Sequence, residues 1–508
     1  MAEHFIEIDT NHIQRHNVVE NDLFANREAV AEVYQQFASA EVSIIVVGFN
    51  RLEKTRRCVE SILTYTEGID YELILVDSGS SDGTLEFFHS VSCPKKRVIH
   101  ITQNLGAAYA YTTISLRDLG NYICVAPNDL IVTKNWLSNL LTCIKSDPKI
   151  GMVTPMASNS SNLQSLDFPY RSYEEMQKKA AAFNRSDPRK WEDRLRLITL
   201  GTVYRKEVFL ASGWPMNDVG YFHDFLDDDT TFAIRALGYR TVLAGDTWIC
   251  HDHNVRGGEG KDLEEFQRSL RIGRENFKLK HFGVDAWDDV NNFYRPYLED
   301  LTPPAVTGRT RVLGVDVRCG TPILDAKNWL RSHGIFSAGL SAFTQDPKYW
   351  QDLMTICEDG VFCDREEFLA DAFPRESFDI VIADRPLNRY HEPQKLLNDL
   401  SALCKKGGLI LCKLRNTFSF QEYVHLLGQR GVYDGEFPLH IPLEAVKAAL
   451  EKLGAVEKIV AEPFQADGGL RETLSGILPA GLSPDQREEL LTRMQSREYR
   501  FFVRKRAR

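Results

Sequence analysis

The sequence contains no long apolar segment. No run of hydrophobic residues approaches the roughly 20 that a helix needs to cross a bilayer, and no secretory signal opens the chain. The ten cysteines are scattered, and none of them forms a CxxC pair. This spacing excludes a zinc ribbon and a dithiol redox motif. We therefore expect a protein without a membrane span that resides in the reducing cytoplasm.

An excess of basic residues is also lacking. The chain has 61 Lys and Arg residues against 71 Asp and Glu residues, a formal net charge of -10. General nucleic-acid binders carry a basic footprint, so we expect no nucleic-acid partner. With 508 residues the chain is too long for one compact core, and we expect two or more domains.

Short apolar, β-branched runs alternate with amphipathic stretches in two series. The first series begins at Val42 with SIIVVGF, and the second begins after Pro303 and Pro304 with TRVLGVDV. Such alternation is typical of parallel sheets with crossover helices. The stretch from Asn21 to Ala40 has helical spacing and predicts a leader helix. We predict an α/β protein with four segments: a helical leader (1–40), a first α/β domain (41–285), a linker (286–309) and a second α/β domain (310–508).

Three polar groups follow predicted strands of the first series. Asp77 ends ELILVD, Asn128 and Asp129 follow NYICVAP, and WICHDHN ends on His251 and His253. Ligands bind at the carboxyl ends of strands in open α/β sheets, where carboxylates suit a nucleotide hydroxyl or a divalent cation. The alternative for Asp77 is an ordinary helix cap, and a single histidine is more often structural.

Three consecutive acids, Asp227, Asp228 and Asp229, precede an amphipathic helix. Acids at a helix start complement the helix dipole, which is the structural alternative. Three in a row exceed the need of a cap, and crowded carboxylates raise one another's pKa values. A carboxylate with raised proton affinity suits a general base, so this run is a candidate for proton abstraction.

The order of these segments resembles that of the inverting family 2 glycosyltransferases of GT-A fold. The resemblance extends from about Val42 to Phe282 through SIIVVGFNR, VDSGSSDGT, NLGAAYA, APNDLIVTKNWL, DDDTTFAIRALGYR and CHDH. It implies a nucleotide-sugar-binding domain whose donor-binding residues are Phe49, Asn50, Asp77, Asn104, Gly106 and Asn128. It further implies that Asp129 and His251 hold a divalent metal, Mn²⁺ or Mg²⁺, although Pro127 stands where the family often has another acid.

The resemblance also implies a catalytic base on the acceptor side. Alignment on the downstream arginine and glycine of AIRALGYR places the family's acid pair at Asp228 and Asp229. Asp229 is the expected base, and Asp227 is its nearest rival. Weaker acceptor-side candidates are Gly201, Asp227 and His253. A single base facing the donor carbon implies direct displacement with inversion, and the absence of a QxxRW segment implies transfer of one sugar at a time.

The second series resembles S-adenosylmethionine-dependent methyltransferases. TRVLGVDVRCGTPILDAKNWL, FDIVIADRPLN and GGLILCKL carry the resemblance, which implies a Rossmann-like fold for about Thr310 to Arg506. Arg318 and Pro322 stand where that family needs glycines for close approach to the cofactor. Ser341 stands where an acid would hold the ribose. We therefore expect a non-catalytic domain that does not bind S-adenosylmethionine.

The sequence favours a hexosyltransferase that uses a nucleoside-diphosphate sugar, with UDP as the default nucleotide. The expected acceptor is a protein or peptide side chain, such as that of flagellin, or a surface glycan. Two alternatives stay open because a fold does not fix a function. One is a bifunctional glycosyltransferase and methyltransferase, and the other is a non-catalytic scaffold that binds glycans or proteins. Assembly as a homo-oligomer is compatible with the sequence.

Overall fold

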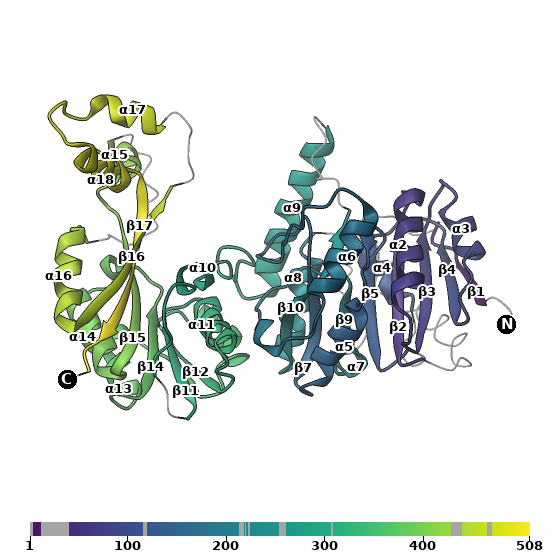
Figure 1. The fold of residues 1–508 in the computed structure, drawn as a ribbon, viewed down its shortest axis with the longest axis horizontal. Coiled ribbons are helices and arrows are strands. Elements are labelled where there is room, and N and C mark those ends of the chain that lie inside the picture. Colours follow the sequence, from purple (N-terminus) through teal and green to yellow (C-terminus); the bar gives the residue numbers. More distant parts are fainter. Residues whose placement is uncertain are drawn as a thin grey trace. The chain divides into compact units, whose positions relative to one another are not determined.

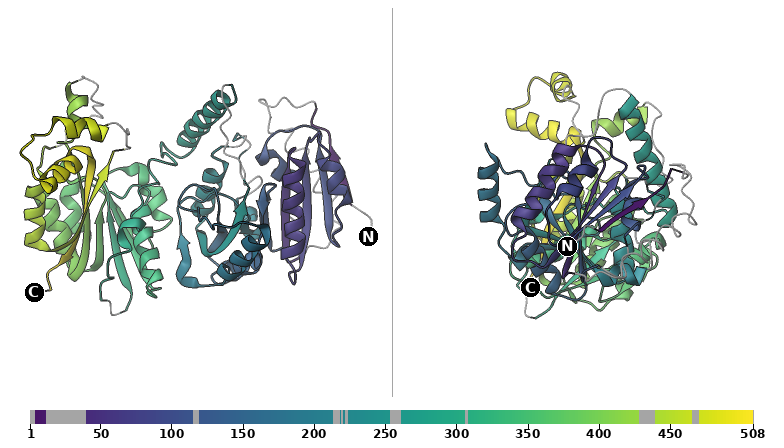
Figure 2. Two further views of the ribbon diagram at one scale, coloured as in Figure 1. Left: turned by 45° about the horizontal axis from the view of Figure 1, so that its top comes forward. Right: turned by 90° about the vertical axis from the view of Figure 1, so that its right-hand side faces the viewer.

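The chain divides into two compact units, Met1–Asn291 and Asn292–Arg508, each built on a sheet flanked by helices (Figures 1 and 2). The structure is a computed structural model. It describes residues 4–11, 40–114, 119–212, 218, 220–221, 224–252, 261–305, 308–427, 439–464 and 470–507.

The described strands of the first unit form a ten-stranded sheet in the order β1-β4-β3-β2-β5-β9-β7-β10-β6, with β8 paired to β10. Their bounds are β1 (His4–Ile8), β2 (Val42–Gly48), β3 (Tyr71–Ser78), β4 (Lys96–Ile101), β5 (Tyr122–Pro127), β6 (Leu130–Ile131), β7 (Ile150–Ala157), β8 (Trp191–Asp193), β9 (Thr202–Arg205) and β10 (Arg240–His251). The first five strands of this order are mutually parallel and lie side by side in Figure 1. Their carboxyl ends therefore share one edge of the sheet.

The parallel strands of the first unit are buried on both faces. Ile44 and Val46 of β2 belong to one core cluster, while Ile45 between them belongs to the other. This arrangement explains the continuous apolar run of β2, since strands covered by helices on both faces do not alternate. The helices of this unit are α2 (Leu52–Tyr65), α3 (Thr84–Ser90), α4 (Ala107–Thr112), α5 (Trp136–Lys145), α6 (Tyr173–Phe183), α7 (Lys206–Ser212), α8 (Leu226–Ala236), α9 (Lys261–Lys280) and the 3-10 helix η1 (Pro188–Lys190).

The second unit has a seven-stranded sheet in the order β13-β12-β11-β14-β15-β17-β16. The strands are β11 (Thr310–Val315), β12 (Ala338–Thr344), β13 (Val361–Cys363), β14 (Phe378–Ala383), β15 (Cys404–Arg415), β16 (Gly454–Pro463) and β17 (Ser496–Lys505). Strands β11 to β15 are parallel, whereas β17 is antiparallel to both of its neighbours.

The helical elements of the second unit connect and flank these strands. They are α10 (Arg295–Leu298), α11 (Thr321–Ser332), η2 (Pro347–Tyr349), α12 (Trp350–Met354), η3 (Glu366–Phe368), α13 (Leu369–Ala372), η4 (Leu387–Arg389), α14 (Pro393–Leu403), α15 (Phe420–Leu427), α16 (Leu443–Leu453), α17 (Leu470–Ile477) and α18 (Pro484–Gln495). No helix of the described ranges is both long enough and apolar enough to cross a membrane.

The segment expected to be a helical leader contributes a strand. Residues His4–Ile8 form β1, which pairs in parallel with β4 at the edge of the first sheet. Ile6 and Ile8 are two residues apart and share one face of the sheet, whereas Phe5 points to the other face and is exposed. Apart from Ala40, the residues over which a leader helix was predicted lie outside the described part of the chain.

The predicted linker is divided between the two units. The boundary falls between Asn291 and Asn292, inside the segment 286–309. Asn292 donates to Asp384 at 2.7 Å, and the backbone amide of Tyr294 donates to Asp325 at 2.6 Å. The residues after the boundary are thus fixed to the second unit, although their prolines and acids are typical of a loop.

The acid that the sequence appeared to lack in the second unit follows β12. Ser341 lies inside this strand and is buried, because β12 continues to Thr344. Asp346 comes two residues after the strand end and caps η2 by accepting a hydrogen bond from the amide of Lys348 at 2.9 Å. The strand was therefore predicted to end too early, and the prediction that no acid follows it was wrong.

Candidate functional site

The turns after β2 and β3 are joined by hydrogen bonds around Asn50. Its amide donates to the hydroxyl of Ser80 at 2.9 Å, and its side-chain oxygen accepts from the amide of Ser81 at 3.0 Å. Asn50 has a φ of 55°, a left-handed conformation that asparagine tolerates better than most residues. Phe49 beside it is exposed. The two turns thus form one polar surface at the carboxyl edge of the sheet.

Asp77 ends β3 and is fully buried. Its Oδ2 lies 2.7 Å from Nδ1 of His100, which occupies the paired position on β4. The amide of Ser80 donates to the same carboxylate at 3.3 Å. The carboxylate therefore orients both the turn after β3 and the ring of His100. Sequence reasoning missed His100, and its signal would have been a histidine near the end of a neighbouring parallel strand.

Asn104 and Gly106 form a tight turn after β4. The side-chain oxygen of Asn104 accepts from the amide of Gly106 at 2.9 Å and from the hydroxyl of Ser78 at 3.3 Å. Gly106 has a φ of 97°, a conformation that residues with a Cβ rarely adopt. Asn104 thereby attaches this turn to the end of β3.

Asn128 and Asp129 lie between β5 and β6, against the start of α2. The side-chain amide of Asn128 donates to the hydroxyl of Thr55 at 2.9 Å. Asp129 is buried, with Oδ2 at 3.9 Å from the guanidinium of Arg51. Antiparallel pairing of β6 with β10 brings His251 to Asp129, and their Oδ1 and Nε2 atoms are 3.5 Å apart.

The ring of His251 is oriented by a backbone carbonyl. Its Nδ1 lies 3.2 Å from the carbonyl oxygen of Asn159, so a proton on Nδ1 leaves the Nε2 lone pair on the side of Asp129. A carbonyl that holds one ring nitrogen is the usual support of a metal-binding histidine. His253, the second predicted histidine, lies outside the described residues.

Asp129 and His251 have the chemistry of a partial metal site. Within the described ranges no group of three or more His, Cys, Asp or Glu side chains could hold a metal ion. Mg²⁺ and Mn²⁺ accept few protein ligands and complete their coordination with phosphate oxygens and water. One carboxylate and one oriented imidazole therefore fit an ion that arrives with a diphosphate.

Basic side chains of α2 surround the same edge. Lys54 lies 3.7 Å from Asp252, and Arg57 lies 2.7 Å from its other carboxylate oxygen. The amide of Asp252 donates to the carbonyl oxygen of Asp129 at 2.9 Å. Together with Arg51, these cations offset the acids and make the edge suitable for an anionic ligand. Sequence reasoning missed all three cations, because charged residues in a helix are usually solvated.

The three acids at the start of α8 have different environments. Asp229 is fully buried between Nζ of Lys280 and Nε2 of His281, each at 2.8 Å. Asp228 is buried against the guanidinium of Arg196. Both carboxylates are thus paired with cationic or titratable side chains and fix the start of α8.

Asp227 differs from its two neighbours. Its carboxylate accepts a hydrogen bond from the hydroxyl of Thr199, and its side chain is only partly buried. Burial raises the pKa of Asp227 to about 6, and the charge of Asp228 adds to this effect. A carboxylate with this proton affinity can accept a proton near neutral pH.

The segment before β9 runs between the acid cluster and the edge that carries Asp129 and His251. Gly201 has a φ of 62°, and a Cβ there would meet Ile249 at 3.0 Å and Leu130 at 3.7 Å. Ile249 is two residues before His251 in the chain, and Leu130 directly follows Asp129. Thr199, whose hydroxyl donates to Asp227, is two residues before Gly201 in the chain.

Comparison with known proteins finds a family match within the first unit. Residues 43–203 match the family model described as "Glycosyl transferase family 2". No curated protein matches the chain. A solved structure of the mannosyltransferase PcManGT from Pyrobaculum calidifontis, in complex with GDP-Man and Mn²⁺, is similar with 16% identity and a TM-score of 0.34. That match covers 51% of this chain and 74% of the other.

A S-adenosylmethionine-dependent methyltransferase from Archaeoglobus fulgidus is similar with 18% identity and a TM-score of 0.28, covering 48% of this chain and 99% of the other. The predicted α/β class is confirmed, because each unit is built on a sheet of mainly parallel strands flanked by helices.

Proposed function

We propose, from the premise that residues 43–203 form a glycosyltransferase family 2 domain, that the protein moves one sugar from a nucleoside-diphosphate sugar to an acceptor hydroxyl with inversion. UDP-sugars are the favoured donors. A protein or peptide side chain, or a surface glycan, is the acceptor. One observation carries the proposal. Gly201 packs beside Leu130 and Ile249, which neighbour the Asp129 and His251 pair in the chain, and it lies two residues from Thr199, which donates to Asp227.

The donor half of the site binds the nucleotide and its diphosphate. Asn50 and Phe49 lie at the surface formed by the turns after β2 and β3, where a nucleoside would be held. Asp129 and His251 would hold a divalent ion, which supplies charge neutralisation to the departing diphosphate. Arg51 and Lys54 place positive charge at the same edge.

The acceptor half requires a base, and the contacts favour Asp227 over Asp229. Asp229 is enclosed, and its two carboxylate oxygens are already paired with Lys280 and His281. Asp227 accepts hydrogen bonds from the hydroxyl and the backbone amide of Thr199, and burial raises its pKa to about 6. Asp227 would remove the proton from the acceptor hydroxyl. The acceptor oxygen would attack the anomeric carbon on the side opposite the leaving diphosphate.

The donor half is tested by metal-dependent nucleotide binding. Calorimetric titration with UDP, GDP and dTDP, each with Mn²⁺ and with EDTA, is expected to show one nucleotide that binds tightly only with metal. Asp129→Asn removes a ligand and is expected to weaken that binding by more than the roughly 10- to 100-fold that loss of an outer partner costs a metal site.

The matched control is Asp371→Asn, the same change at an exposed aspartate of the second unit. It is expected to bind the nucleotide as the unmodified protein does. If no nucleotide binds under any metal condition, the donor assignment is wrong and the scaffold alternative gains support. If Asp129→Asn binds normally, the metal is held elsewhere.

A further inference from the structure

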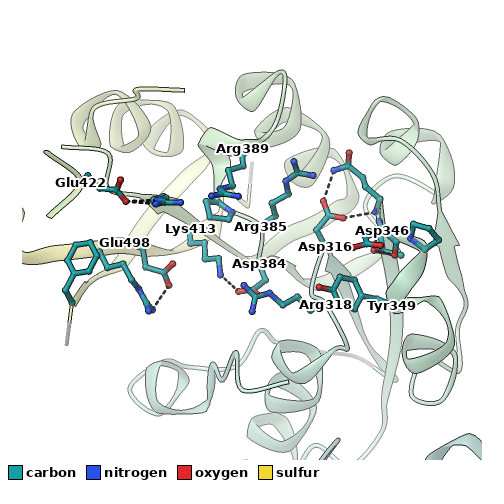
Figure 3. Close-up of a pocket in the computed structure, with 17 residues that line it drawn as sticks. Asp316, Arg318, Asp346, Tyr349, Asp384, Arg385, Arg389, Lys413, Glu422 and Glu498 are labelled. Carbon is teal, nitrogen blue, oxygen red and sulfur yellow. Dashed lines mark hydrogen bonds and ion pairs between the residues drawn. The ribbon is translucent and has the colours of Figure 1, made fainter. Parts of the chain in front are cut away.

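The second unit contains a cavity of about 760 Å³ at the carboxyl ends of β11, β12, β14 and β15 (Figure 3). Its volume is that of a small-molecule site, and the carboxyl edge is where open α/β sheets bind ligands. The lining comes from the turns after these strands and from β15 and β17. Nothing in the proposed glycosyl transfer uses this cavity.

Basic side chains are the most numerous charged residues in the lining of the cavity. Six of its described lining residues are cationic: Arg318, Arg385, Arg389, Lys413, Arg415 and Arg497. They come from four different segments of the chain, so the fold gathers them from far apart. An arginine has five N–H donors and can hold an internal carboxylate and still bind an anionic ligand. The set therefore offers many convergent donors.

The acids of the lining are largely neutralised by cations. Lys413 lies 2.9 Å from Asp384, as Figure 3 shows, and Arg415 lies 2.6 Å from Glu422. Glu498 lies 2.9 Å from Arg500 and 3.8 Å from Arg497, and both arginines also pair with Glu462.

Asp316 is held by hydrogen bonds within the lining. It accepts from the backbone amide and the side-chain amide of Gln345, both at 2.8 Å. Burial raises the pKa of Asp316, while these hydrogen bonds and the charge of Arg385 oppose that effect. Six cationic side chains against five acids leave a small positive field in the cavity.

The turn between β11 and α11 adds to this field. Arg318 has a φ of 53°, and Gly320 before the helix has a φ of 107°. Helix α11 has 12 residues and begins at Thr321, directly after this turn. The N-terminus of a helix carries partial positive charge, and here it stands beside a guanidinium that lines the cavity.

We propose that this cavity binds a phosphate-bearing small molecule. Its phosphate oxygens accept hydrogen bonds from Arg318, Arg385 and Lys413, since guanidinium groups match phosphate geometry. Tyr349 and Asp346, which also line the cavity, suit a ring and a hydroxyl pair of such a ligand. A sulfonium cation is disfavoured beside these guanidinium groups, because like charges repel strongly in a partly desolvated cavity.

The experiment is calorimetric titration of the full chain in EDTA, at low and high salt, with AMP, inorganic pyrophosphate and S-adenosylmethionine. EDTA removes the metal that the glycosyltransferase site requires, and Asp129→Asn, tested in parallel, is expected to leave the metal-free response unchanged. AMP or pyrophosphate is expected to bind, and its affinity is expected to fall with added salt because salt screens charge pairing. Preference for AMP identifies a nucleotide, and preference for pyrophosphate identifies a phosphate ligand without a nucleoside.

Arg385→Gln is expected to lower the affinity for the preferred probe about ten-fold or more, because it removes charge-assisted hydrogen bonds. Arg389→Gln is the second variant, and it is expected to lower the affinity for the same probe. Arg375→Gln makes the same change at an exposed arginine outside the lining, and it is expected to have no effect.

Two results overturn the proposal. One is the absence of metal-free binding by AMP and pyrophosphate to protein whose circular dichroism shows it is folded. The other is tight binding of S-adenosylmethionine that neither phosphate probe displaces. Both results concern the second unit, so they leave the metal-dependent nucleotide test of the glycosyltransferase site unaffected.

Discussion

Asp227→Asn is expected to lower the transfer rate by about 100- to 10,000-fold, the range that loss of a general base costs an enzyme. The asparagine is nearly isosteric and its side-chain oxygen can still accept from Thr199. The change therefore removes proton acceptance with little disturbance of the fold. The measurement is the rate of sugar transfer with saturating donor, once the donor is known from the nucleotide titration.

The pH dependence of the unmodified enzyme gives an independent test. A base must be deprotonated to act, and the pKa of Asp227 is raised to about 6. The value of kcat/KM is expected to rise with pH up to about 6 and then to level off, because the reactive carboxylate becomes fully populated above its pKa. In Asp227→Asn this rising limb is expected to disappear.

Asp229→Asn is the matched comparison, two residues further along α8 in the same acid cluster. Asp229 is paired with Lys280 and His281, so its loss is expected to destabilise α8 against α9 more than it changes the chemical step. A small loss of rate with a lower unfolding temperature supports this role. A rate loss as large as that expected for Asp227→Asn, in a protein of normal stability and with Asp227→Asn active, would instead identify Asp229 as the base.

Sequence reasoning predicted the α/β class because it depends on local patterns. Continuous apolar runs such as that from Ser43 to Gly48 are a signature of strands buried on both faces, and both units contain them. The β1 strand was missed because five residues with weak alternation have no local signal, and the partner β4 lies about 90 residues later. The extent of β12 was misjudged because no glycine or proline is adjacent to Thr344 to mark where the strand ends.

The environments of the acids were not predictable for a related reason. Asp227, Asp228 and Asp229 are identical in type and adjacent in sequence. The partners that separate their roles come from distant segments: Thr199, Arg196, Lys280 and His281. Nothing in the order of residues states which acid meets a hydroxyl and which meets a cation. The fold therefore decides the protonation chemistry of a motif that the sequence can only locate.

Lys413→Met is expected to destabilise the second unit by about 3–5 kcal/mol, the cost of leaving a buried charge without its partner. Asp384 is fully buried, and Lys413 is 2.9 Å from its carboxylate. Although burial alone would raise the pKa of Asp384, the charges of Lys413, Arg500 and Arg318 hold it below the ordinary value. Hydrogen exchange of the β14 and β15 amides measures the effect in this unit alone, and Lys447→Met, at an exposed lysine, is the control.

The destabilisation is expected to depend on pH in a direction that the pKa of Asp384 fixes. A depressed carboxyl pKa contributes stability above the unfolded value of about 3.9, and this contribution is lost as the pH falls through the folded value. In Lys413→Met the same carboxyl has lost its main cation and is protonated at higher pH, which relieves its buried charge. The difference between variant and unmodified protein should therefore be large near pH 7 and shrink towards pH 4. A difference that is constant over this range would show that Lys413 stabilises the unit through packing rather than through its charge.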